Sequence, residues 1–198
     1  MYTVTMRPRA RPLRPHALAG AIALGILLSS RPPAVSAETP TQTPAEPDVL
    51  YVPTPQPVVD AMLDLAAVTR DDVVYDLGSG DGRIVITAAK KFGARGVGID
   101  IDPLLVKKAQ DNAAAAGVAG KVTFQAGNLF TADISQATVV TLYLLQSLNE
   151  RLRPKLVREL KPGTRVVSHV FNMGPEWPPE KTITIGNSRI YLWTISNK

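Results

Sequence analysis

The stretch YDLGSGDGRIV, residues 75–85, decides the fold. Apolar residues at 73–77 predict a short buried strand, and residues 83–92 continue with the spacing of a helix. Between the two lies a turn with a glycine at every second position, where the backbone can approach a ligand closely because glycine has no Cβ. A strand, a glycine turn and a helix place backbone N–H groups and a helix N-terminus at one point, which predicts a ligand-binding loop.

Short apolar runs and helical segments alternate after this loop. The expected strands are residues 96–99, 122–126, 137–145 and 165–171, and the expected helices are residues 102–117 and 148–160. Alternating strands and helices indicate a parallel sheet covered on both faces. Residues 182–185 and 190–195, joined by GNS, predict an antiparallel hairpin. We therefore expect a single-domain α/β fold, a Rossmann-like doubly wound and mostly parallel sheet with a C-terminal antiparallel hairpin.

The beginning of the chain has the order of a secretory signal. Arginines at 7, 9, 11 and 14 precede an apolar run at 17–28, and small residues at 35 and 37 form a cleavage site. The run is shorter than the roughly 20 residues of a membrane-spanning helix, which favours cleavage over anchoring. We expect residues 1–37 to be a signal peptide, 38–50 a linker rich in proline and threonine, and 51–198 the folded domain.

This leader predicts an exported domain, either periplasmic or secreted. A retained membrane anchor is one alternative, and a cytoplasmic protein whose start is misplaced is another. Five of the 22 basic residues precede Glu38 and no acid does, so residues 38–198 carry 17 charges of each sign. That balance argues against a broad nucleic-acid-binding surface. The chain has no cysteine, which excludes disulfides.

Carboxylates around the glycine turn indicate the kind of ligand. The spacing G-x-G-x-G departs from the G-x-G-x-x-G of dinucleotide loops. Asp76 and Asp81 would repel phosphates, but they suit the positive amino-acid end of S-adenosylmethionine. Asp100 ends the second expected strand, 24 residues after Asp76, where a carboxylate can accept hydrogen bonds from both ribose hydroxyls.

From about residue 51 to 177 the chain resembles the class I S-adenosylmethionine-dependent methyltransferases, because DLGSGDGR and an acid ending the second strand are specific in combination. It is most similar to the branch of the ATP synthase c-subunit lysine N-methyltransferases, through YVPTPQPVVDAML, DLGSGDGRIVI and GTRVVSHVF. The resemblance implies S-adenosyl-L-methionine as cofactor, no metal ion, and N-methylation of a protein lysine or a small amine. The alternatives are an exported cofactor-binding module and a scaffold, both without catalysis.

The resemblance also implies roles for individual residues. It assigns to the cofactor Asp76, Gly78, Ser79, Gly80, Gly82, Asp100, Ile101, Asn128 and Leu129. The first five would line the methionine part, Asp100 would hold the ribose, and Ile101 would cover the adenine beside Leu129. Asn128 stands where the superfamily commonly has an acid for the adenine amino group, and its amide oxygen can accept the same hydrogen bond.

The segment before the first expected helix, which starts near Val58, has two interpretations. In the branch that the chain resembles, this segment would lie over the cofactor, which makes Tyr51 and Thr54 candidate contacts. The alternative is a linker stiffened by proline, with Tyr51 packed on the core. Membrane contact is expected only through an uncleaved leader, and the sequence carries no signal for an oligomeric state.

The acceptor is expected near the end of the fourth strand, in VVTLYLLQSLN. This stretch lacks the Asn/Asp-Pro-Pro-aromatic motif that many enzymes acting on planar amines carry, which disfavours adenine or glutamine amide as acceptor. Tyr143 is the candidate catalytic residue, shaping the acceptor channel, and the alternative is a strand tyrosine bonded to the backbone. His169 is the only histidine after residue 37 and can accept a proton, although a strand histidine can equally be structural.

Overall fold

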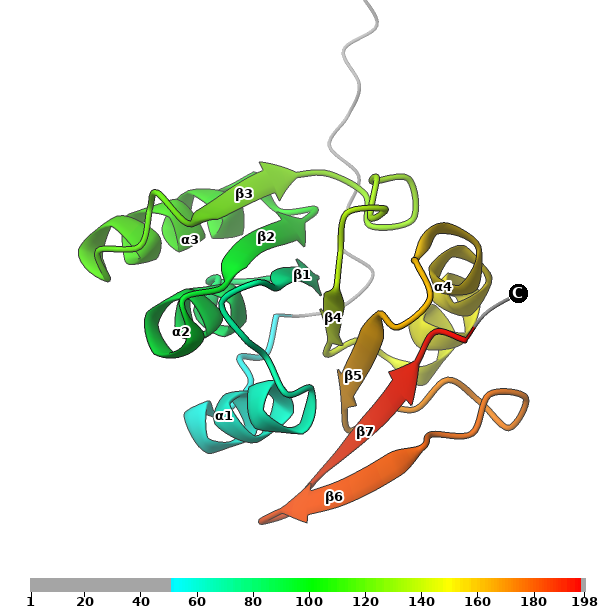
Figure 1. Cartoon of the computed structure of the whole chain (residues 1–198). Coiled ribbons are helices and arrows are strands. Elements are labelled where there is room, and N and C mark those ends of the chain that lie inside the picture. The colour runs from blue at the N-terminus through cyan, green and yellow to red at the C-terminus, as the bar shows by residue number, and fades with distance from the viewer. Residues whose placement is uncertain (1–50, 197–198) are drawn as a thin grey trace, which may run out of the picture. The chain divides into compact units, whose positions relative to one another are not determined.

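The structure is a computed structural model that describes residues 51–196 (Figure 1). The expected signal peptide and linker, residues 1–50, lie outside the described residues. The helices are α1 Gln56–Leu65, α2 Arg83–Phe92, α3 Pro103–Ala115 and α4 Gln146–Glu159. The strands are β1 Val73–Leu77, β2 Arg95–Asp100, β3 Val122–Ala126, β4 Val139–Leu142, β5 Arg165–His169, β6 Lys181–Ile185 and β7 Ser188–Thr194.

The strands form one seven-stranded sheet in the order β3-β2-β1-β4-β5-β7-β6. The first five strands along the chain are parallel, and β7 runs antiparallel to both β5 and β6. This topology confirms the expected doubly wound sheet with its C-terminal hairpin. The strand order reverses between β1 and β4, and in such sheets ligands bind beyond the carboxyl ends of the strands at that reversal.

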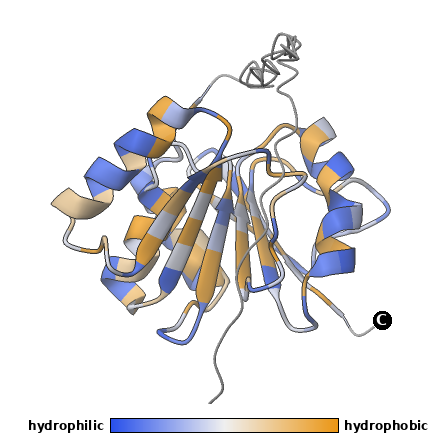
Figure 2. Ribbon diagram, turned by 90° about the horizontal axis from the view of Figure 1, so that it is seen from above, coloured by the Kyte–Doolittle hydropathy of each residue, from blue (hydrophilic) through white to orange (hydrophobic). Residues whose placement is uncertain are grey.

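Helices cover both faces of the sheet, as Figure 1 shows. α1, α2 and α3 pack on one face through a cluster that includes Met62, Val85 and Val139. α4 and two loops cover the other face, where Leu142, Leu152 and Trp193 are fully buried. Each helix turns its apolar side to the sheet (Figure 2), so the two clusters hold the strand ends rigidly in place.

Two of the parallel strands end two or three residues earlier than the sequence predicted. The fourth was expected over residues 137–145, but β4 ends at Leu142 and α4 starts at Gln146. The fifth was expected to reach residue 171, but β5 ends at His169 because Val170 has a φ of 68°. Tyr143 therefore lies in a short connection at the carboxyl edge of the sheet. No helix within residues 51–196 is long and apolar enough to cross a membrane.

Candidate active site

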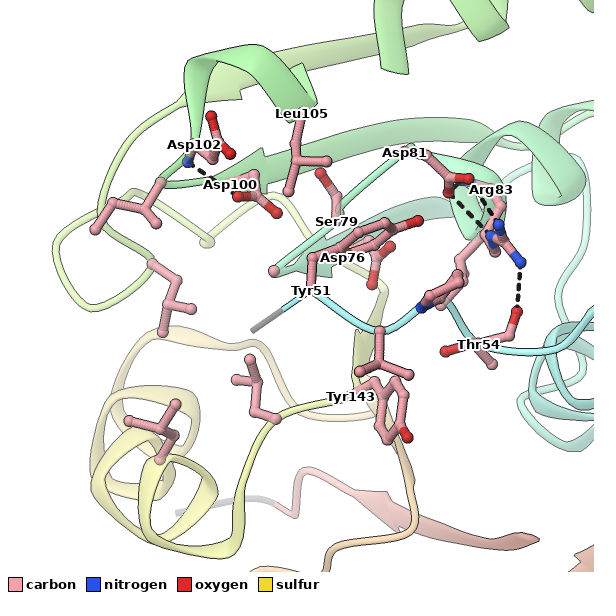
Figure 3. Close-up of a pocket in the computed structure, with 18 of the residues that line it drawn as sticks. Tyr51, Thr54, Asp76, Ser79, Asp81, Arg83, Asp100, Asp102, Leu105 and Tyr143 are labelled. Atoms are coloured by element: carbon pink, nitrogen blue, oxygen red, sulfur yellow. Dashed lines mark hydrogen bonds and ion pairs between the residues drawn. The ribbon is translucent and has the colours of Figure 1, made fainter. Parts of the chain in front are cut away.

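A cavity of about 320 Å³ opens at the carboxyl ends of β1, β2 and β4 (Figure 3). Residues 51–54, here called the N-terminal strap, form part of its wall. Ten of the twelve predicted site residues line the cavity: Tyr51, Thr54, Asp76, Gly78, Ser79, Asp100, Ile101, Asn128, Leu129 and Tyr143. Segments far apart in sequence therefore meet at the edge where the fold predicts a ligand.

The two remaining predicted residues, Gly80 and Gly82, do not line the cavity and instead shape the turn. A Cβ on Gly80 would lie 2.2 Å from the ring of Tyr51, so only glycine lets the strap pack here. A Cβ on Gly82 would lie 2.6 Å from the ring of Phe124, which belongs to the core. Both glycines have positive φ, and their lack of a side chain serves packing between elements.

Asp100 holds the glycine turn as well as facing the cavity. Its Oδ2 accepts the N–H of Gly80 at 2.7 Å, and its Oδ1 accepts the N–H of Asp102 at 3.0 Å. Each carboxylate oxygen can accept a second hydrogen bond, so both remain able to take a ribose hydroxyl. The residue thus ties the end of β2 to the turn after β1 and fixes the two sides of the cavity to each other.

Asp76 is buried at the end of β1 and faces the cavity. Thr141 on the neighbouring β4 donates its hydroxyl to Asp76 Oδ1 at 2.8 Å. Burial raises the pKa of Asp76 to about 7, and the charge of Asp100 acts in the same direction. A positively charged group of a ligand placed beside this buried carboxylate would stabilise its ionised form. The site therefore favours a cationic ligand group over a neutral one.

Asp81 does not present a free carboxylate, contrary to the role that the sequence suggested for it. Arg83 donates from Nε at 2.9 Å and from Nη2 at 2.7 Å to its two oxygens. Burial alone would raise the pKa of Asp81, but the hydrogen bonds and charge of Arg83 outweigh it and hold that pKa below its ordinary value. Arg83 also donates from Nη1 to the carbonyl oxygen of Thr54 at 2.9 Å.

This arginine therefore fastens the N-terminal strap to the start of α2. Tyr51 packs against Gly80, and its buried hydroxyl lies beside the carboxylate of Asp81. Burial, followed by the negative charge of Asp81, raises the pKa of that hydroxyl. Thr54 is also buried. The strap is thus part of the cavity wall, and Tyr51 packs on the glycine turn and belongs to neither core cluster, in contrast to the second interpretation. Contact of the strap with the cofactor remains a prediction.

Asn128 lies beyond the end of β3, because that strand ends at Ala126. Its amide oxygen accepts the N–H of Phe130 at 2.9 Å, which forms a tight local turn. The oxygen retains a second lone pair, and so it can still accept a hydrogen bond from an adenine amino group. Ile101 and Leu129 line the same end of the cavity and supply apolar surface for a flat ring.

Tyr143 closes the other end of the cavity, beyond β4. Its ring stacks on His169 of β5, with ring centroids 4.1 Å apart and planes tilted by 41°. Leu144 and Leu148 line the wall beside it, so this end is mainly apolar and aromatic. Tyr143 is neither inside a strand nor fully buried, in contrast to the structural alternative that the sequence allowed.

Sequence reasoning missed several residues of the wall. They are Val52, Pro53, Arg83, Ile84, Asp102, Leu105, Gly127, Phe130, Leu144 and Leu148. Most of them are next to a predicted residue in the chain. The motifs therefore predicted the segments that form the wall, but not each residue of those segments. The ion pair of Asp81 and Arg83 could have been predicted from the sequence, because the two opposite charges stand on either side of Gly82.

These residues fit S-adenosylmethionine. Buried carboxylates face the cavity from β1 and β2, and the hydroxyl of Ser79 is buried without a partner beside it. The Ser79 hydroxyl also requires a glycine at position 98 of β2, because a Cβ there would lie 2.7 Å from the hydroxyl oxygen. Within residues 51–196, no cluster of three or more histidine or acidic side chains is arranged to hold a metal ion.

Comparison with known proteins agrees with this site. Residues 76–181 match the family described as the ANTKMT methyltransferase domain. A protein-lysine N-methyltransferase of Saccharolobus islandicus is 50% identical over 154 residues, which cover 75% of this chain and 95% of that protein. The mouse ATP synthase c-subunit lysine N-methyltransferase is 34% identical over 160 residues, 80% of this chain and 64% of the mouse protein.

A solved structure gives the same result. The RNA methyltransferase of Salinibacter ruber, in complex with S-adenosyl-L-homocysteine, has 62% sequence identity and a TM-score of 0.73, covering 74% of this chain and 95% of its own. These matches disfavour the non-catalytic alternatives. The chain belongs to the ANTKMT methyltransferase domain family, and it is an S-adenosylmethionine-dependent methyltransferase.

Proposed function

We propose that this enzyme methylates the side-chain nitrogen of lysine in a protein. The names of two relatives, a protein-lysine N-methyltransferase and an ATP synthase c-subunit lysine N-methyltransferase, support this acceptor class. The charge of the cavity supports it independently. Four carboxylates line the wall, and the single basic residue of that wall, Arg83, is neutralised by Asp81.

That imbalance is the observation that carries the proposal. Asp81 is paired, and Asp76 is only partly ionised at neutral pH because its pKa is about 7. Asp100 and Asp102 still leave a net negative potential in a partly enclosed cavity, which attracts cations. A protein lysine arrives as an ammonium ion, and the amino-acid end of the cofactor is also positive. A phosphate backbone would be repelled by the same potential.

When bound, S-adenosylmethionine supplies a methyl group on a positively charged sulfur. The chain contributes alignment of the reactants and exclusion of water, which are large effects in such transfers. The lysine must lose a proton before its nitrogen can attack. The apolar wall of Tyr143, Leu144 and Leu148 favours the neutral amine, because desolvation penalises the charged form.

An RNA acceptor is the second candidate, because the solved relative from Salinibacter ruber is named an RNA methyltransferase. An RNA-binding site normally has a basic face that follows the phosphates. Residues 38–198 carry equal numbers of basic and acidic side chains, so they offer no basic excess for a phosphate backbone. The charged residues of the wall are mainly acidic, four aspartates against one arginine, and this balance favours lysine over a base of RNA.

The test is methyl transfer from tritiated S-adenosylmethionine to an extract of source cells that lack this enzyme. We expect label that survives ribonuclease, is released by protease, and runs as methyl-lysine after acid hydrolysis. A variant with Asp111→Ala, in an exposed ion pair on α3, is the matched control and should label equally. Label released by ribonuclease alone would show that RNA is the acceptor.

We also propose that the domain works outside the cytosol. The order of arginines, apolar residues and small residues in the leader supports export. Fractionation of cells with a C-terminal tag tests this proposal. We expect tagged protein in the periplasm or medium, shortened by about the length of the leader. Full-length protein found only in the cytosol would contradict it.

A further inference from the structure

His169 is an anomaly among the buried side chains at the end of β5. It is 2% exposed, and neither Nδ1 nor Nε2 has a hydrogen-bond partner. Leaving a buried polar group unpaired costs about 1–3 kcal/mol, so most such groups in folded proteins are satisfied. A phenylalanine would fill the same space without that penalty, which indicates that the ring nitrogens have a use.

The position of His169 suggests what that use is. Tyr143 stacks on the imidazole at 4.1 Å and also lines the cavity, so the histidine lies one ring behind the acceptor wall. Tyr143 belongs to a connection of three residues that is neither helix nor strand. A side chain in such a connection can change rotamer more easily than one fixed within a strand.

The backbone after His169 is strained. Val170 has a φ of 68°, and the N–H of Phe171 reaches back to the carbonyl oxygen of His169 at 2.8 Å. Such a tight turn is rare, and a β-branched residue in it is an outlier that costs about 1–3 kcal/mol. Strain of this kind concentrates at functional sites, and here it adjoins the unpartnered imidazole.

The surroundings keep the imidazole neutral. Burial lowers the pKa of His169 from its ordinary value, and no charged group contributes to the shift. The elements packed against β5 carry Asp60 and Asp64 on α1 and Arg189 on β7, and Asp60 is held in an ion pair by Lys91. A neutral imidazole beside the acceptor wall is in the protonation state that can take up a proton.

We propose that His169 is the proton acceptor for the lysine ammonium, and that Tyr143 is the side chain that covers it until the acceptor binds. This role rests on the proposed lysine acceptor. One imidazole nitrogen takes a proton from the ammonium and becomes positively charged. The lysine nitrogen then forms its bond to the methyl carbon as the bond from that carbon to sulfur breaks, and the imidazolium later releases its proton to water.

The variant His169→Phe tests the proposal, because it keeps the ring and removes the nitrogens. We expect the melting temperature to stay or rise and the Kd for S-adenosyl-L-homocysteine to change less than about twofold. Methyl transfer to the extract proteins should fall roughly 100-fold at pH 7, the typical size of a general-base effect. The loss should shrink toward pH 10, where lysine, with a pKa of about 10.4, ionises unaided.

A matched control is Tyr191→Phe, which removes the hydroxyl of a buried tyrosine of β7 outside the cavity and should leave transfer unchanged. Transfer by His169→Phe within about threefold of the original enzyme at every pH would overturn the proposal. Failure of the original enzyme to label lysine would instead overturn the proposed function, and the base role with it.

A second measurement needs no acceptor. The chain has two histidines, so the signal of His169 in a proton NMR titration is assigned by its loss in His169→Phe. In Tyr143→Ala the imidazole should become accessible, and we expect its pKa to rise toward the ordinary value of about 6.5. An unchanged pKa would show that Tyr143 is not the cover, which contradicts the proposal.

Discussion

The two ends of the cavity are built in opposite ways. At the cofactor end, the carboxylates of Asp76, Asp81 and Asp100 all accept hydrogen bonds from the chain, and positive φ angles fall on glycines. At the acceptor end, the wall is apolar and aromatic, His169 is unpartnered, and the positive φ falls on Val170.

This difference corresponds to two tasks, which are binding the cofactor at one end and deprotonating and methylating the acceptor at the other. The cofactor is the same molecule in every turnover, so a pre-formed set of charges and donors can hold it with little reorganisation. The acceptor must enter, lose a proton and leave methylated, which favours a wall that can move. The strained backbone at Val170 marks the second task, as expected when a protein departs from consistency at a functional site.

The largest effect is expected from Asp100→Ala at the cofactor end. The change removes the predicted acceptor for two ribose hydroxyls and also frees the N–H groups of Gly80 and Asp102. Hydrogen bonds to a charged group contribute about 1.5–3 kcal/mol each, so the Kd for S-adenosyl-L-homocysteine should rise at least about 100-fold in calorimetry. If folded Asp100→Ala bound S-adenosyl-L-homocysteine as tightly as the original enzyme, binding at the cofactor end would not depend on its fixed charges. That result would contradict the contrast drawn between the two ends.

A smaller effect is expected from pH, through Asp76. Its pKa of about 7 should fall when a positive ligand binds, so binding releases a proton and strengthens as pH rises. Between pH 6 and pH 8 the Kd for S-adenosyl-L-homocysteine should tighten by about tenfold. Calorimetry in Asp76→Asn should show weaker binding at pH 8 and little of this dependence.

The same residue should oppose stability. Because the folded pKa of Asp76 lies above its ordinary value of 3.8, its contribution to stability is present at low pH and is lost as pH rises through about 7. Asp76→Asn should therefore raise the melting temperature at pH 8 relative to the original protein. A lower melting temperature would show that Asp76 is structural.

A still smaller effect on cofactor affinity is expected when the strap is no longer held by Arg83. In Arg83→Ala the strap loses its bond through the carbonyl of Thr54, and Asp81 becomes unpaired. Because Arg83 is partly exposed, we expect the Kd for S-adenosyl-L-homocysteine to rise only about fivefold to tenfold. Arg70→Ala, an exposed arginine outside the cavity, is the control. An unchanged Kd in Arg83→Ala would mean that the strap is held by Tyr51 alone.

The smallest effect is expected at the acceptor end, from Val170→Gly. Glycine accepts the φ of 68° without strain, and we expect a gain of about 1 kcal/mol in the free energy of unfolding, measured with urea. Val157→Gly, in an exposed position of α4, should lose a few tenths of a kcal/mol instead. A loss of stability in Val170→Gly would show that the turn is not strained.

The sequence predicted the fold and most of the cofactor end because both depend on local patterns. The strands at 73–77 and 122–126 and the helix at 83–92 agree with the structure residue by residue. The glycine turn and Asp100 are fixed by their positions after β1 and at the end of β2, so ten predicted residues meet in one cavity. Their contacts with the cofactor remain predictions.

The rest depends on contacts between distant segments. The strand at 137–145 was drawn too long because its apolar run continues through Leu144 and Leu145, which serve the cavity and the start of α4. The stacking of His169 on Tyr143 joins the ends of two neighbouring strands and has no signature in either. The same holds for the bond of Arg83 to Thr54, which are 29 residues apart.

One measurement tests the central claim most directly, that the cavity at the carboxyl ends of β1, β2 and β4 holds the cofactor. Hydrogen–deuterium exchange of the full chain, with and without S-adenosylmethionine, reports where the ligand slows exchange of backbone N–H groups. We predict slowed exchange in residues 51–54, 76–84, 100–105 and 127–130, which contain most of the wall residues. Unchanged exchange there, or protection confined to the hollow lined by Gln56 and Lys90, would contradict the claim.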